Sequence, residues 1–341
     1  MMKPWHWLPV DLSHDLGKRF IKTAGNLPYR RLTYRPLEWM GLTFENPIGV
    51  AGGIDKECEQ IRGWWHYSAG FVEVGTITPQ AQLSLPKPNI LRDAKSKVLW
   101  NRLGFPNPGQ SRALQLLRNL PEPHFTPLFV NIGRNRETSN ERAHLDYIRL
   151  IQLLSPVADT FVINISSPNT VGLRNLLDPE TLSRFLGELH EVRSEMANKG
   201  MYRPLLLKLS PDIETNQFKE VIEICKNNQI DGWVLTNTTA QRSDSRWPKD
   251  GGLSGGLLAP LARKSLETLV ETLGFQRQKY LIVSCGGVLS AQDIADRLMM
   301  GAHLVQVYTA LALEGPWFIR NSLFELKDQD PNPISLRHIG A

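Results

Sequence analysis

Residues 161–170 read Phe-Val-Ile-Asn-Ile-Ser-Ser-Pro-Asn-Thr, a short apolar run that ends in hydroxyl and carboxamide side chains. Such a run is typical of a buried strand that carries side chains to a site at its C-terminal end. Pro168 biases Ser167 away from helical geometry. Asn164 and Asn169 can donate and accept hydrogen bonds without carrying charge. An ordinary turn would give the same residues, so the segment predicts either a turn or the edge of a site for a ligand with amide or imide groups.

The same pattern recurs along the chain from residue 45 onward. It predicts eight strands, at 48–51, 71–74, 128–132, 160–165, 205–209, 232–235, 280–284 and 304–307. Amphipathic stretches between them predict helices at 143–154, 179–197, 216–227, 261–273 and 291–300. This alternation is typical of a (β/α)8 TIM barrel, an α/β fold. The alternative, an open doubly wound sheet, usually stops at about five to seven strands.

Two segments are predicted to lie outside this regular alternation. The residues near 77–126 are rich in Pro and Asn, and a long segment after a barrel strand is typical of a lid or substrate loop. Residues 251–256 contain four glycines and are predicted to form a flexible loop before the seventh strand.

The composition limits the classes of function. The chain has 341 residues, 41% of them hydrophobic, which suits one large α/β domain with an appendage. It contains no apolar run long enough for a transmembrane helix, and no signal peptide is predicted. Its three cysteines show no metal-ligand spacing, which favours a reducing compartment and predicts no metal site. The modest net charge of +5 argues against a nucleic-acid partner.

Residues 1–40 are predicted to form a separate helical module, with residues 41–341 forming the barrel domain. The module holds seven basic and three acidic side chains, so most of the net charge lies there. Leu12, Leu16, Phe20 and Ile21 form one apolar helical stripe. The stripe either packs on the barrel or rests on a membrane surface, with basic residues facing anionic lipid.

Two lysines are candidates for a functional role. Lys208 interrupts the apolar strand 205–209, where a cation must find a partner, lose its charge or extend to water. Lys56 follows Gly52 and Gly53, where the backbone can approach a flat ligand closely, although a lysine after a strand is more often simply solvated.

Taken together, the ordered motifs resemble the dihydroorotate dehydrogenase family, and most closely its quinone-dependent, membrane-associated class. The resemblance covers residues 40 to about 320. It is carried by Asn46-Pro47, Gly53 to Lys56, Val72 to Thr76, Asn101 to Phe105, Asn131 to Gly133, Asn164 to Thr170, Lys208, Thr236 to Thr238, Gly252 to Gly255 and Gly286-Gly287.

The resemblance implies that the chain holds FMN and dihydroorotate. It implies FMN contacts from Gly52, Gly53, Lys56, Thr76, Asn131, Asn164, Lys208, Thr236, Gly255, Gly287, Tyr308 and Thr309. It implies substrate contacts from Lys56, Asn101, Arg102, Leu103, Gly104, Phe105, Asn164, Asn169, Asn237 and Thr238.

The implied reaction oxidises dihydroorotate to orotate in pyrimidine biosynthesis, with a quinone as final electron acceptor. Ser167 takes the place of the catalytic base, and Thr170 and Phe105 match a proton relay that assists it. Cys58 and Cys285 are chemically possible bases outside the matching motif. The class implies a peripheral enzyme on the cytoplasmic face of the inner membrane. The alternatives are a soluble relative that uses fumarate or NAD, which Ser167 disfavours, and a catalytically silent scaffold.

Overall fold

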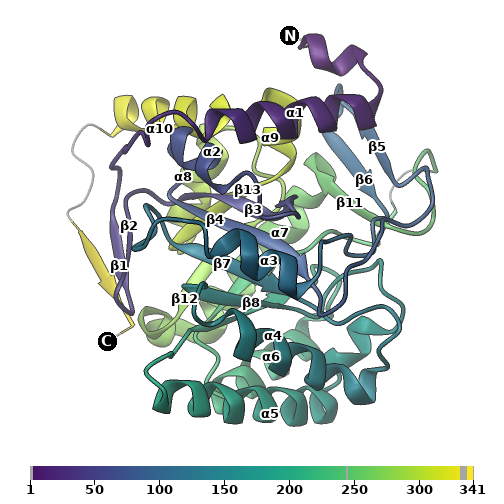
Figure 1. The fold of residues 1–341 in the computed structure, drawn as a ribbon, viewed down its shortest axis with the longest axis vertical. Helices are drawn as coiled ribbons and strands as arrows, with labels where there is room; N and C mark the ends of the chain where they lie inside the picture. Colours follow the sequence, from purple (N-terminus) through teal and green to yellow (C-terminus); the bar gives the residue numbers. More distant parts are fainter. Residues whose placement is uncertain (1–2, 243–244, 331–335, 341) are drawn as a thin grey trace.

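The computed structural model describes residues 3–242, 245–330 and 336–340, and its centre is a closed barrel of parallel strands (Figure 1). The barrel strands follow in order as β3 (Ile48–Asp55), β4 (Phe71–Ile77), β7 (Leu128–Ile132), β8 (Thr160–Asn164), β9 (Leu205–Leu209), β10 (Gly232–Leu235), β12 (Leu281–Cys285) and β13 (Leu304–Val307), and β13 pairs with β3. The predicted TIM barrel is thus confirmed. All eight predicted strands are present, and β3 and β4 run further than predicted.

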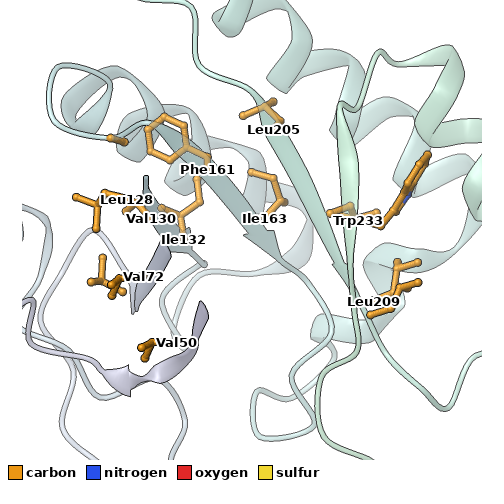
Figure 2. Close-up of a cluster of buried hydrophobic side chains, with 14 of the residues drawn as sticks. Val50, Val72, Leu128, Val130, Ile132, Phe161, Ile163, Leu205, Leu209 and Trp233 are labelled. Atoms are coloured by element: carbon orange, nitrogen blue, oxygen red, sulfur yellow. The ribbon is translucent and has the colours of Figure 1, made fainter. Parts of the chain in front are cut away.

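Helices surround the barrel and cover the outer face of its strands (Figure 1). They are α2 (Ile61–His66), α3 (Gln110–Leu117), α4 (Ala143–Leu154), α5 (Pro179–Asn198), α6 (Thr215–Asn227), α7 (Ala259–Leu273), α8 (Ala291–Met299), α9 (Thr309–Glu314) and α10 (Trp317–Gln329). Outward-facing side chains such as Val72, Val130 and Ile163 pack into the cluster between strands and helices (Figure 2). The five predicted helices are confirmed, whereas α2, α3, α9 and α10 are additional to the prediction.

The inner face of the strands carries a layer of large apolar side chains. Because side chains alternate along a strand, the residues between the outward-facing ones point into the barrel. This inner layer consists of Phe71, Phe129, Val162, Leu206, Val234, Leu281, Val283 and Leu304. It fills the lower part of the barrel, by which we mean the part where the barrel strands begin. A ligand site therefore has room only in the upper part, where the strands end.

A small sheet closes the lower end of the barrel. It consists of β1 (Leu37–Trp39), β2 (Leu42–Phe44) and β14 (Arg337–Ile339), and β1 pairs with both of the others. The fully buried Trp39 and Phe44 pack on the inner apolar layer. The predicted boundary at residue 40 therefore lies in the turn between two strands of this sheet.

The segment predicted as a lid is partly a second small sheet on the upper side. It contains β5 (Ile90–Asp93) and β6 (Val98–Asn101), and β6 also pairs with β11 (Gly252–Gly255). The prediction of a flexible glycine loop at 251–256 is therefore wrong for residues 252–255. Their strand form comes from backbone pairing with β6, which needs no side chain.

The N-terminal segment forms η1 (Pro4–Trp7) and α1 (Val10–Ala24), which lie over the upper side near β5 and α2 (Figure 1). Three residues of the predicted stripe face outward, since Leu12, Leu16 and Phe20 are 47%, 48% and 55% exposed. Ile21 is buried against the barrel domain. None of the helices in the described ranges has the length and hydrophobicity needed to span a bilayer.

Removing an inner-layer ring should strongly destabilise the fold. We expect Phe129→Ala to lower the free energy of unfolding by about 3–5 kcal/mol, because it leaves a cavity beneath the site. Urea unfolding checks this value, with the fully exposed Phe275→Ala as the control that should change little. Equal losses in the two variants would contradict the role assigned to the inner layer.

Candidate active site

The site begins two residues beyond the apolar layer, where the inner face of the barrel becomes polar. The inward side chains at this level are Glu73, Asn131, Asn164, Lys208, Thr236, Cys285 and Gln306. All except Glu73 line one cavity. The strand period of two therefore places a polar floor directly above the apolar filling.

The structure brings nearly all of the predicted site residues around this cavity. Those that line it are Gly52, Gly53, Lys56, Thr76, Asn101, Leu103, Gly104, Phe105, Asn131, Asn164, Ser167, Asn169, Lys208, Thr236, Asn237, Thr238, Gly255, Gly287, Tyr308 and Thr309. Arg102 and Thr170 do not. The Arg102 guanidinium binds Asp250 (2.7 Å) and the Pro86 carbonyl oxygen (3.2 Å), so it braces the lid segment.

Lys208 has a buried ionic partner. Its Nζ donates to Oε1 of Glu73 at 3.0 Å, and both side chains are buried. Oε1 also accepts from Nδ2 of Asn131 (2.6 Å), and Oε2 accepts from Nε2 of Gln306 (2.5 Å). Lys208 thus neither extends to water nor lacks a partner.

Neutral donors and acceptors form a chain along one side of the floor. Nδ2 of Asn164 donates to Oγ1 of Thr76 (2.9 Å) and Oδ1 of Asn131 (3.2 Å). Nδ2 of Asn237 donates to Oδ1 of Asn164 (3.2 Å). Since each amide is fixed by its neighbours, the free edges of these side chains point in set directions, as a specific polar ligand requires.

Ser167 lies just past the end of β8, on the wall of the cavity, and is almost fully buried. Its Oγ accepts from the backbone N–H of Asn169 at 3.2 Å, which leaves the hydroxyl proton free to be donated elsewhere. Three residues further on, Oγ1 of Thr170 is buried and has no hydrogen-bond partner among the described residues. Phe105 reaches the cavity from a backbone with φ of +56°, a conformation held by bonds from Asn107 and Gln82 to its carbonyl oxygen.

Burial shifts the pKa of Lys56 and of the two cysteines considered as bases. Burial, together with the charge of Lys18, lowers the pKa of Lys56 to about 8. Burial raises the pKa of the Cys285 thiol to about 11 and that of Cys58 well above its usual value. Both thiols are therefore protonated at neutral pH and are poor bases.

Two glycines on the cavity wall let their backbone approach other segments closely: Gly287 approaches Ala259, and Gly255 approaches Lys97. Gly255 and Gly287 have φ of +84° and +71°. A Cβ at Gly287 would lie 2.3 Å from Cα of Ala259, and one at Gly255 would lie 2.0 Å from the carbonyl oxygen of Lys97. These positions require glycine, and their backbone atoms face the cavity.

Several residues at the site had no role assigned from the sequence. Glu73 and Gln306 are polar residues inside apolar strands, so the signal that identified Lys208 would have found them. His14 and Arg92 gave no such signal. The pKa of His14 on α1 is lowered to about 3, chiefly by burial and also by the nearby charge of Lys56. Arg92 on β5 donates to the carbonyl oxygens of Trp5, His6 and Leu8 at 3.1–3.2 Å.

Comparison with known proteins identifies the family and the fold of the chain. The family model for dihydroorotate dehydrogenase matches residues 36–329. A dihydroorotate dehydrogenase (quinone) of Thermus thermophilus is 40% identical over 85% of this chain and 82% of the relative. The enzyme of the same name from Vibrio parahaemolyticus is 39% identical over 92% and 95%.

A solved structure agrees with these sequence matches. The crystal structure of the dihydroorotate dehydrogenase of Eimeria tenella in complex with ferulenol superposes with a TM-score of 0.85 and 31% identity, covering 95% of this chain and 92% of that one. From its sequence, its barrel and its strand-end site, this chain belongs to the dihydroorotate dehydrogenase family, in the quinone-dependent class.

Proposed function

We propose that the chain oxidises dihydroorotate to orotate in the strand-end cavity, with FMN as hydride acceptor and a membrane quinone as final electron acceptor. Family membership gives the reaction, which is a step of pyrimidine biosynthesis. The observation that carries the site assignment is that Ser167, Lys56 and Lys208, far apart in sequence, line one cavity.

The cavity suits FMN by the chemistry of its lining. A flavin ring presents amide-like donors and acceptors, which the fixed carboxamides of Asn131 and Asn164 complement. Oε1 of Gln306 is buried at the cavity without a hydrogen-bond partner in the part of the chain that the structure describes, so it is available to a ligand. Gly255, at the end of β11, and Gly287, just after β12, line the cavity in the part of the fold where barrels often bind phosphate through loop backbone N–H groups.

Dihydroorotate would lie over this floor, beneath the lid. Nδ2 of Asn169 donates to Oδ1 of Asn101 at 3.0 Å, while Oδ1 of Asn169 is buried and no described residue bonds to it. Together with Asn237 and Thr238, these groups can bind the amide edges of the substrate ring. The Lys56 ammonium supplies a positive charge for the substrate carboxylate.

In the proposed mechanism, Ser167 removes a proton from one ring carbon of dihydroorotate. FMN would be held by residues such as Asn131, Asn164 and Lys208, and it would supply the hydride-accepting group for the neighbouring carbon. Serine needs help to act as a base, because its hydroxyl has a high pKa. Thr170 follows Ser167 by three residues, and Phe105 lines the same cavity as Ser167. We propose that Oγ1 of Thr170 receives the Ser167 hydroxyl proton on its way to solvent, while Phe105 excludes other water.

We further propose that η1 and α1 rest on the inner membrane at its cytoplasmic face and admit quinone; membrane association is typical of the class. The exposed apolar face of Leu12, Leu16 and Phe20 supports this contact. Phe20 stacks on Tyr67, which in turn contacts the half-exposed Trp317 of α10 edge-on, so the apolar face continues onto the barrel domain.

Two basic residues of α1 bind the barrel domain, whereas the membrane interpretation of the sequence has the basic residues facing anionic lipid. Lys18 pairs with Glu57 (2.9 Å) and Lys22 with Glu59 (2.7 Å), so these two lysines hold α1 on the barrel domain. Membrane binding should therefore depend more on the apolar face than on these cations. The segment from residue 28 onward binds the barrel through the Pro28, Arg30 and Leu32 carbonyl oxygens, so we place the end of the separable module near residue 27.

A comparison of electron acceptors tests the proposed activity. Purified protein should carry yellow FMN and oxidise dihydroorotate rapidly when a quinone is the sole acceptor. Fumarate or NAD as sole acceptor should give little turnover. Rapid turnover with either of them would place the chain in a soluble class instead, and protein without flavin would contradict the cofactor assignment.

Replacing Ser167 should stop the chemical step without removing the flavin. We expect Ser167→Ala to reduce flavin reduction by dihydroorotate by roughly 10²–10⁴-fold in stopped flow, because the base is lost. Ser210→Ala is a matched control, since Ser210 Oγ also accepts the N–H two residues on, at 3.2 Å, but lies outside the cavity. If both variants reduce flavin at similar rates, Ser167 is not the base.

Substrate capture should weaken at alkaline pH. The Lys56 pKa of about 8 means that its ammonium is present below pH 8 and is lost above it. We expect kcat/KM for dihydroorotate to fall about tenfold per pH unit well above pH 8, and Lys56→Arg to move this decline upward, because arginine keeps its charge. A profile that stays flat to pH 10 would exclude Lys56 as the carboxylate partner.

The apolar face of α1 should control membrane binding. We expect the double variant Leu16→Ser, Phe20→Ser to lose most vesicle binding and most turnover with long-chain quinone, while flavin reduction by dihydroorotate is unchanged. Vesicle co-sedimentation measures this, with exposed Phe275→Ser as the control. Deletion of residues 1–27 should have the same effect. Undiminished vesicle binding would show that the segment only packs on the barrel.

A further inference from the structure

Glu73 lies at the centre of the polar floor and has no exposed surface. Its two oxygens accept hydrogen bonds from Asn131 on β7, Lys208 on β9 and Gln306 on β13. Side chains from three other strands thus hold one carboxylate beneath the cavity. This arrangement fixes the position of the carboxylate and, through it, that of the Lys208 ammonium.

The backbone of β3 leaves room for this carboxylate. A Cβ at Gly52 would lie 2.1 Å from Oε1 of Glu73, so Glu73 occupies the space that a side chain would fill. Buried ion pairs are a weak source of stability, because desolvation offsets their attraction. Stability alone therefore does not explain a buried ion pair that depends on Gly52 and on side chains from three other strands. A functional role explains it.

We propose that Glu73 is a positioning residue for the redox step: its carboxylate holds the Lys208 ammonium at the cavity floor and keeps it charged, and so sets the affinity of the site for reduced FMN over oxidised FMN. The inference rests on the proposed binding of FMN in this cavity. Reduced FMN carries a negative charge on its ring, which a fixed cation stabilises.

The charged and titratable groups around Lys208 leave Glu73 as its anionic partner. Cys285 on β12 faces Lys208, but its pKa of about 11 keeps the thiol neutral. Arg297 on α8 lies behind Cys285 and is a cation, as is Lys56 on the cavity wall. Asn131, Asn164 and Gln306 complete the surroundings without charge. Among the described residues, Glu73 is the ion-pair partner of Lys208.

Two opposing effects act on Lys208. Burial lowers its pKa, but the charge of Glu73, with a contribution from Cys285, outweighs burial and leaves the pKa above its ordinary value. Without the charge and the hydrogen bond of Glu73, burial is the larger effect and the pKa of Lys208 falls. Lys208 would then be an unopposed cation at low pH and a neutral amine at high pH.

The midpoint potential of bound FMN, measured from pH 6 to pH 10 in the holoenzyme, tests this. At pH 6 we expect Glu73→Gln to raise the ratio of reduced to oxidised FMN affinity at least tenfold over wild type, because the cation lacks its counter-charge. At pH 10 the ratio should fall to that of the double variant Glu73→Gln with Lys208→Met, in which neither side chain carries a charge. The wild-type and Glu73→Gln curves should therefore cross, and parallel curves would overturn the proposal.

Asp231→Asn is the matched control. It breaks another buried ion pair, with Arg193 at 2.6 Å, which does not line the cavity. It should leave the potential curve unchanged, and a similar crossing in this variant would overturn the proposal by showing that the crossing reflects general loosening.

A double variant decides the question if Glu73→Gln alone does not fold. Glu73→Gln with Lys208→Met removes both charges and should bind FMN at least as well as Lys208→Met, which leaves Glu73 buried and unpaired. Weaker FMN binding by the double variant would mean that Glu73 acts independently of Lys208. Wild-type protein that lacks FMN would contradict the proposed function, whereas active wild type with parallel curves would contradict this inference alone.

Discussion

The alternation of side chains along strands in a closed barrel is the constraint on which the site depends. Each inward position is followed, two residues later, by another inward position one level higher. Phe71 is followed in this way by Glu73, Phe129 by Asn131, and Leu206 by Lys208. The apolar level excludes water from below, so the polar level works in a medium of low polarity, where charges interact strongly.

The upper side of the barrel is built from segments that meet through one small sheet. Asn101 ends β6 at the cavity, Gly255 ends β11 at the glycine segment, and Arg92 on β5 holds the carbonyl oxygens of η1. These three strands pair side by side, so the N-terminal segment, the segment near 77–126 and the glycine backbone at the cavity form one hydrogen-bonded unit. In the proposed function, quinone entry, substrate cover and cofactor support would share this scaffold.

Much of this architecture could be predicted from the sequence, because hydrophobic runs and periodicity report local burial directly. Strands β7, β9, β10 and β13 begin and end where the apolar runs do. Strand β11 could not be predicted, since its glycines form a strand only through a partner about 150 residues away in the chain. The stripe on α1 predicted a helix and its apolar side. The periodicity of a sequence does not indicate whether that side contacts protein or lipid. The direction of the Arg102 side chain depends on Asp250 in a distant loop, and this too left no local signal.

The pairing of β1 with β14 has a consequence for how the protein is made. Leu37 lies opposite Arg337 in register, so the base of the barrel joins two strands that are about 300 residues apart in the chain. A ribosome releases residues 37–39 well before residues 337–339, so β1 lacks this partner while the barrel strands between them are made. During that interval the inner apolar layer lacks part of its cover from below. Residues 337–339 thus complete this cover, and a nascent chain that stops short of them would leave part of the inner apolar layer exposed to solvent.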